Sequence, residues 1–169
     1  MNSIMEAVRR LAFAMHVLSG ILLIGMMVTV LLDVISRGVF GASGGEIDFT
    51  FQGGVEIVSY GLLFMVLFTL PHSVSRSQIV VDLFTEAMSA RLKAVLAGIY
   101  TFGFGLLGIG MAVRFFQAVG RVAETGETTQ DLLIPMTFIY GATAFATTVL
   151  ALRGILVALC QLREGWGQP

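Results

Sequence analysis

The sequence has 169 residues, a formal net charge of −1 and a mean hydropathy of +0.89, and only 12% of its residues are charged. A soluble domain carries about 25% charged residues, so this composition excludes an ordinary soluble protein. The slightly negative charge and the lack of a Lys/Arg cluster exclude a nucleic-acid partner. The single cysteine, Cys160, excludes an internal disulfide. The composition therefore predicts a protein whose surroundings are a lipid bilayer.

Four segments of the chain contain no Asp, Glu, Lys or Arg. Each is close to the roughly 20 residues that an α-helix needs to cross about 30 Å of hydrocarbon. We therefore expect an all-α integral membrane protein, a single four-helix membrane domain over residues 1–169. The predicted spans are 11–32, 57–75, 94–113 and 132–152.

The basic residues predict the orientation of these spans. Placing both chain ends inside leaves seven Lys and Arg residues on the inner side and three on the outer side. This asymmetry follows the positive-inside rule, so we expect an N-in/C-in topology.

Three charged residues lie at the outer ends of the first two spans. Asp33 and Arg37 are four residues apart, so on a helix they share one face, with the acid in the favourable N-terminal position. Such a pair contributes only about 0.2–0.5 kcal/mol in water. Glu56 opens the second span at the same membrane face. We expect Asp33, Arg37 and Glu56 to form one polar cluster that joins the first two helices.

The third and fourth spans each carry a row of small residues spaced three or four apart. In lipid, such rows allow two backbones to approach closely, so we expect them to contact each other or a partner helix. The rows are Ala94, Gly98, Thr101, Gly105, Gly108 and Ala112 in the third span, and Thr137, Gly141, Ala144, Thr148 and Ala151 in the fourth.

The connecting segments differ in character. Residues 38–54 are rich in glycine and aromatic residues, which predicts a turn and a short interfacial segment. Residues 77–93 are amphipathic, which suits a helix in the inner interface or a solvated helical linker. Residues 114–131 are expected to prolong the third helix to a turn at Gly126, and Pro135 falls near the start of the fourth helix.

The residue types needed for catalysis or ion transport are missing from the spans. The interiors of the spans contain no acidic or basic residue apart from the weakly basic His16 and His72, whereas ion and proton pathways use buried ionisable groups. There is no nucleotide-binding loop, no nucleophile paired with a base and no zinc-type spacing. We therefore expect neither an enzyme nor a pump acting alone, and no metal or other cofactor.

Four short motifs follow one another along the chain: Asp33-Val-Ile-Ser-Arg37-Gly-Val-Phe40, Glu56, Arg76-Ser-Gln78-Ile79-Val-Val-Asp82 and Leu133-Ile-Pro135. With the four spans, their order resembles the small membrane subunit, of the DctQ type, of tripartite ATP-independent periplasmic (TRAP) transporters. The sequence departs from the family pattern at Gln78, where histidine is usual, and at Thr137, where tryptophan is common.

The resemblance implies a small permease subunit in the bacterial inner membrane that braces a larger multi-span subunit, the carrier of sodium and solute. It also implies a soluble periplasmic solute-binding protein that delivers an organic acid for sodium-coupled uptake. Segments 38–55 and 114–131 would help to dock that protein. Arg76, Gln78 and Asp82 would form a motif at the inner face.

Two other classes of protein fit part of the pattern. His16 and His72 lie on adjacent helices at similar depth, so they could supply the two axial ligands of a haem in the membrane anchor of a respiratory enzyme. A small oligomeric exporter fits the length of the chain, but such a protein would be expected to have an acidic residue inside a span.

Overall fold

A computed structural model describes residues 2–46, 49, 52–74 and 89–167 of the chain. It contains four long helices: α1 (Asn2–Ala42), α2 (Gly54–Ser73), α4 (Ala90–Thr125) and α5 (Met136–Gly167). α1 and α4 include the whole of the predicted spans 11–32 and 94–113, whereas α2 ends two residues before the end of span 57–75 and α5 begins four residues after the start of span 132–152. All four are long and apolar enough to cross a membrane. The predicted all-α fold with four membrane-spanning helices is confirmed.

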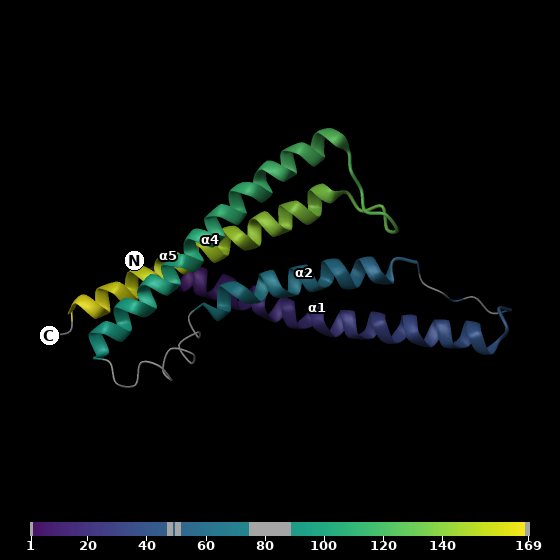
Figure 1. Cartoon of the computed structure of the whole chain (residues 1–169), viewed down its shortest axis with the longest axis horizontal. Coiled ribbons are helices and arrows are strands. Elements are labelled where there is room, and N and C mark those ends of the chain that lie inside the picture. The colour runs from purple at the N-terminus through teal and green to yellow at the C-terminus, as the bar shows by residue number, and fades with distance from the viewer. Residues whose placement is uncertain (1, 47–48, 50–51, 75–88, 168–169) are drawn as a thin grey trace.

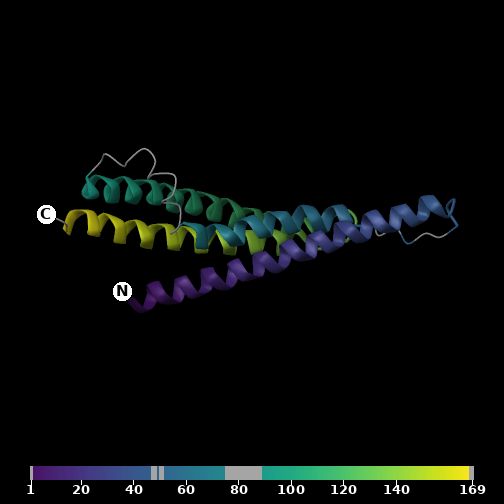
Figure 2. The same ribbon diagram turned by 90° about the horizontal axis from the view of Figure 1, so that it is seen from below.

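The helices form two hairpins. α1 packs against α2 and α4 packs against α5, and α5 also contacts α2 and α1. Among the described residues, α4 contacts no helix other than α5. The two hairpins open away from each other toward the loop between α4 and α5, while both chain ends lie at the opposite end (Figure 1). α1 crosses the other helices obliquely in the perpendicular view (Figure 2). We call the loop, residues 126–135, the connector, and its end of the molecule the connector end.

α1 is longer than the sequence predicted. It has 41 residues and is about 60 Å long at 1.5 Å per residue. The turn expected from residue 38 onward is wrong, because α1 continues to Ala42 and ends only where Gly44 and Gly45 adopt positive φ angles of 64° and 91°. A helical glycine costs only about 1 kcal/mol relative to alanine, so Gly38 does not stop the helix.

The ends of α4 and α5 follow the sequence more closely. α4 runs to Thr125, and Gly126 ends it in the left-handed conformation with φ 67°, as predicted. α5 begins at Met136, directly after Pro135. The predicted amphipathic helix 77–93 lies largely in residues 75–88, outside the described residues. Its last part belongs to α4, which Ser89 caps by accepting a hydrogen bond from the Leu92 amide.

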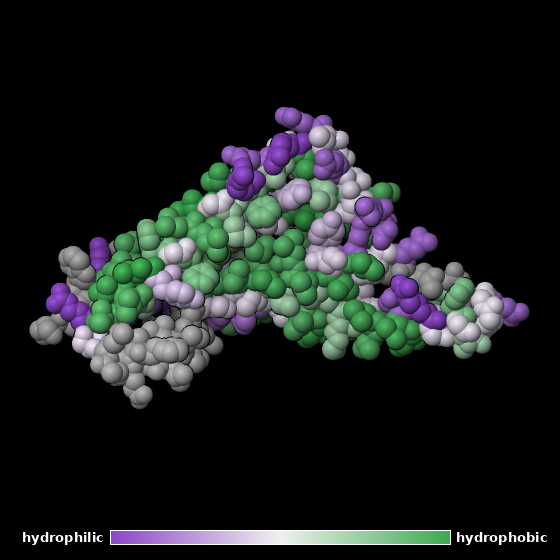
Figure 3. Space-filling model, viewed as in Figure 1, coloured by the Kyte–Doolittle hydropathy of each residue, from purple (hydrophilic) through white to green (hydrophobic). Residues whose placement is uncertain are grey.

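Burial is uneven among the helices. In α5, 56% of the most apolar window is buried, compared with 22% or less in each of the other three. A small core of Met15, Leu67, Ala146 and Val149 joins α1, α2 and α5. Hydrophobic residues cover the middle of the visible face, and hydrophilic residues gather at the end of α4 and on the connector (Figure 3). A bilayer or a partner helix would cover an apolar surface that is as extensive as this one.

Candidate functional site

The charged groups near the connector end of α1 form a local ion pair. Arg37 Nε donates to Asp33 Oδ2 at 2.9 Å, so the pairing expected from their spacing is present. The Arg37 side chain is 64% exposed and that of Asp33 is 24% exposed. An exposed pair of this kind contributes little to stability.

Glu56 has other partners than the ones we expected. Its two carboxylate oxygens accept hydrogen bonds from the backbone amides of Asp131 and Leu132, at 2.9 and 3.0 Å. The described contacts therefore separate the expected cluster into two arrangements: the Asp33–Arg37 pair within α1, and Glu56 with the connector.

The helical periodicity of α2 explains this separation. Residues one apart on a helix point about 100° apart, since a turn has 3.6 residues. Val55 and Val58 line a hollow of about 230 Å³ together with Asp33 of α1. Glu56 and Tyr60 instead line an apolar cavity of about 400 Å³ with residues of α5 and the connector. Glu56 is therefore on the α5 side of α2.

One of the two carboxylate oxygens of Asp33 makes no hydrogen bond to the described part of the chain. Its Oδ1 atom is buried and has no hydrogen-bond partner within the described part of the chain, while its Oδ2 atom binds Arg37. Buried polar atoms in native structures normally have a protein or water partner. The hollow between α1 and α2 beside Asp33 has room for such a partner.

The connector is held by its own backbone as well as by Glu56. The Thr129 amide donates to the Ile134 carbonyl at 2.9 Å, and the Ile134 amide donates to the Thr129 hydroxyl at 3.1 Å. The Met136 amide donates to the Glu127 carbonyl at 3.0 Å, which closes the loop at the start of α5. The connector is thus a compact turn and not an open loop.

The start of α2 fits closely against this turn. Gly53 has φ 100°, and a Cβ atom there would lie 2.8 Å from Leu132 Cδ2. The positive φ favours glycine at this position, whereas the close approach is to the end of a leucine side chain that can move aside. Next to Leu132, Leu133 has φ 51°, and it is the only non-glycine residue with positive φ in the described part of the chain.

The small residues of α4 lie against α5. A Cβ atom on Gly98 would lie 2.7 Å from Leu162 Cγ, one on Gly105 would lie 3.1 Å from the Ile155 amide nitrogen, and one on Gly108 would lie 2.7 Å from the Ala151 amide nitrogen. The α4 row therefore brings two backbones together, as close packing in lipid requires.

The row on α5 is divided. Ala144 is fully buried and Ala151 meets Gly108. A Cβ atom on Gly141, in contrast, would meet nothing within 4 Å. Gly141 was expected to pack against a helix, but in the described chain it faces open space. The close contact between α4 and α5 lies at later residues of α5, such as Ala151 and Ile155.

The α1–α2 contact depends on side chains. The Ser19 and Thr69 hydroxyl oxygens share a hydrogen bond of 2.7 Å, and Met26 packs on Gly61, whose Cβ atom would lie 2.8 Å from Met26 Sδ. One turn from Ser19, the rings of His16 and His72 stack, with centroids 4.8 Å apart and an interplanar angle of 16°. The two histidines are thus neighbours, as expected from their depth.

The stacked geometry does not suit two axial haem ligands. Axial histidines direct a ring nitrogen at the iron from opposite sides of the porphyrin. Here the two ring faces lie against each other, and the rings of Phe13 and His72 meet at an angle of 60° with their centroids 5.7 Å apart. Nothing observed supports the haem-anchor interpretation, and the pair is an interhelical packing contact.

Two further sets of residues complete the comparison with the sequence. Arg76, Gln78 and Asp82, the expected inner-face motif, lie outside the described residues. Arg153 was expected to follow the last span, but α5 continues past it to Gly167, and Arg153 is only 6% exposed. The sequence signalled Arg153 only as the first charge after an apolar segment.

Fold and site together define a class of protein: a multi-pass helical membrane protein with close-packed helices and a structured connector. No group of three or more potential metal ligands occurs in the described ranges. The chain belongs to the family of tripartite ATP-independent periplasmic transporters, DctQ component, which it matches over residues 26–164. Comparisons with curated proteins and with solved structures gave no significant match.

Family membership gives the general role and the location of the chain. It is the small permease subunit of a TRAP transporter, a multi-pass protein of the bacterial inner membrane. Membership implies a complex with a large membrane subunit and a solute-binding protein. The match includes Asp33, Arg37, Glu56 and the connector, whereas His16 precedes it.

Proposed function

We propose that this subunit braces the large membrane subunit, which carries sodium and solute, and helps to dock the periplasmic solute-binding protein during sodium-coupled uptake of an organic acid. It forms a single domain over residues 1–169 and catalyses no reaction of its own. Both chain ends face the cytoplasm, so the connector end faces the periplasm, in agreement with the distribution of basic residues.

The observation that carries this proposal is the uneven burial of the helices. α5 contacts all three other helices and is the most buried, whereas α1 buries one narrow row of residues and leaves most of its apolar side chains uncovered. Exposed residues of α1 include Leu18, Ile21, Ile24, Met27, Leu31 and Leu32. A helix of this kind supports a role in packing against a larger membrane partner better than a role in forming a pathway within the chain.

The polar groups at the connector end support the docking role. Asp33 and Arg37 keep the end of α1 charged, and Glu56 fixes the connector against α2. Segments 38–55 and 114–131, which the sequence predicts on the outer side, provide the surface for the binding protein. Arg76, Gln78 and Asp82, the motif that the sequence predicts at the inner face, contribute to the cytoplasmic contact with the large subunit.

Purification and reconstitution test the proposal. We expect the tagged chain, extracted in mild detergent from its native membranes, to bring a stoichiometric multi-span protein with it. In vesicles, uptake of an organic acid from a labelled panel should require this chain, the multi-span protein, the binding protein and an inward sodium gradient. Full uptake by the other two proteins without this chain would contradict the bracing role.

A further inference from the structure

The feature that the proposed function leaves unexplained is the backbone of Leu133. Its φ of 51° lies in the left-handed region, which a residue with a branched side chain rarely adopts because its Cβ crowds the following carbonyl oxygen. Glycine or asparagine would occupy this position with less strain. Strained residues of this kind persist where the surrounding structure fixes them, and they concentrate at functional sites.

The bonds on both sides of Leu133 fix this conformation. Before it, the amides of Asp131 and Leu132 donate to the two carboxylate oxygens of Glu56. After it, the Ile134 amide donates to the buried Thr129 hydroxyl. Since these contacts come from α2 and from the connector itself, the position of Leu133 is set by the fold and not by its own side chain.

The Leu133 side chain is not buried by this backbone conformation. It is 67% exposed, and the neighbouring Ile134 is 40% exposed. A strained backbone that buried a core side chain would be explained by packing. Here the strain presents an apolar side chain outward on a fixed turn, and a side chain that is already held in place loses little freedom when a partner covers it.

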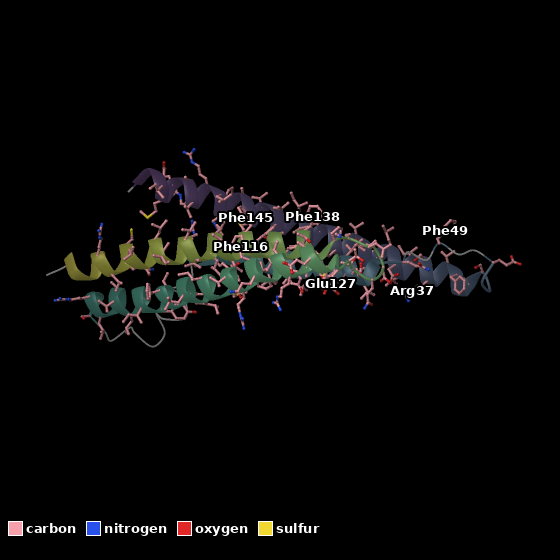
Figure 4. The ribbon with its side chains drawn as sticks, turned by 90° about the horizontal axis from the view of Figure 1, so that it is seen from above. Arg37, Phe49, Phe116, Glu127, Phe138 and Phe145 are labelled. Carbon is pink, nitrogen blue, oxygen red and sulfur yellow. The ribbon has the colours of Figure 1, made fainter. Side chains whose placement is uncertain are left out.

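Exposed charged residues lie on one side of the connector, whereas Leu132 and Ile134 line the apolar cavity on the side of α2. A hollow of about 320 Å³ lies beside the connector, between the end of α4 and α5, and its lining includes Arg121, Glu124 and Glu127. These three residues and Asp131 are exposed. Figure 4 shows Glu127 at the connector, apart from the phenylalanines on the helices. We call these four exposed residues the rim. An apolar side chain in the same turn as Glu127 and Asp131 of the rim fits a partner that approaches from water, because charged groups are costly in hydrocarbon.

We propose that Leu133 is the apolar anchor through which this subunit docks the soluble solute-binding protein, an inference that rests on the proposed function. The rim has three acidic groups and one basic group, so the partner is expected to offer an apolar pocket surrounded by basic side chains. Glu56 and Thr129 act as positioning residues that hold the anchor in its outward conformation.

Two substitutions at one position test the anchor. Leu133→Asn keeps a residue that tolerates positive φ but removes the apolar side chain, whereas Leu133→Met keeps the apolar side chain. The complex with the large subunit, in lipid nanodiscs, is titrated with the binding protein. We expect Leu133→Asn to weaken binding at least tenfold and to leave the unfolding temperature unchanged or raised, and Leu133→Met to bind within about threefold of wild type.

The possible outcomes separate this proposal from its alternatives. Wild-type affinity in Leu133→Asn would overturn the anchor while leaving the docking role of the subunit intact. Lost binding together with a lowered unfolding temperature would assign Leu133 a structural role instead. Unchanged binding together with weaker retention of the subunit in the nanodisc would assign Leu133 to the membrane interface and also overturn the anchor. A wild-type complex that does not bind the protein would refute the docking role itself.

Discussion

The two helix hairpins of this subunit differ in how the two helices within each hairpin pack against each other. Between α4 and α5, backbones meet directly: a Cβ atom on Gly154 would lie 2.8 Å from Gly105 Cα, and one on Gly108 would lie 2.7 Å from the Ala151 nitrogen. Between α1 and α2, side chains fill the space, including the Ser19–Thr69 hydrogen bond. Where two backbones are in contact, no flexible side chain can move aside, so the contact tolerates a larger residue poorly. Contact through side chains can be rearranged at less cost.

This difference agrees with the positions of the two hairpins in the fold. The α4–α5 contact fixes the most buried helix of the chain. The α1–α2 pair carries the larger uncovered apolar surface on α1. A firm hairpin that carries the connector and an adaptable hairpin that faces lipid or a partner are suited to the two roles proposed here, docking and bracing.

The largest effect is expected at the backbone contact. Gly108→Ala places a methyl group 2.7 Å from the Ala151 nitrogen, so the helices must separate, at a cost of about 1–3 kcal/mol. Gly141→Ala is the matched control: its methyl group meets nothing within 4 Å, and alanine favours the helix by about 1 kcal/mol. Thermal unfolding in detergent should be lowered by the first change and unaffected or raised by the second. Equal shifts would mean that the glycine row has no special packing role.

The next largest effect is expected where the hairpins meet. Glu56→Ala removes the acceptor of the Asp131 and Leu132 amides, and hydrogen bonds to a charged acceptor are stronger than those between neutral groups. Hydrogen exchange at these two amides should become much faster than in the wild-type chain. Glu124→Ala removes an exposed acid and serves as the control. Protection retained in Glu56→Ala would show that the connector closes without the carboxylate.

A smaller effect is expected within the α1–α2 contact. A double-mutant cycle with Ser19→Ala and Thr69→Val should give a coupling energy of about 0.6 kcal/mol, the average for hydrogen bonds between membrane helices. Unfolding in detergent measures each variant. A coupling as large as the cost of Gly108→Ala would contradict the distinction between the two hairpins.

The smallest effect on stability is expected at the exposed ion pair, but its pattern is informative. Replacing Arg37 alone leaves the partly buried Asp33 carboxylate without its partner, whereas replacing both removes the unpaired charge. A partly buried carboxylate that has lost its partner destabilises the protein more than the removal of both charges does. The yield of assembled complex should therefore be lower for Arg37→Ala than for the Asp33→Asn/Arg37→Ala variant. The same yield in both would argue against the pairing in the complex.

The sequence alone determined the elements that depend on local patterns. Four uncharged segments predicted the four helices, because crossing a bilayer requires every backbone group to bond within its own helix. The spacing of Asp33 and Arg37 predicted their ion pair, and Gly126 predicted the end of α4, since both depend on neighbours within a turn. The end of α1 was missed because Gly38 only weakens a helix, whereas Gly44 and Gly45 adopt angles that end it.

Only the tertiary structure decided the contacts between distant segments. Glu56 binds amides 75 and 76 residues away, and which side of α2 it occupies depends on how the two hairpins meet. The same packing leaves Gly141 open, encloses Arg153 and holds Leu133 at a positive φ. Local propensity favours none of these outcomes. They follow from the close approach of α4 to α5 and from the closure of the connector over the start of α2.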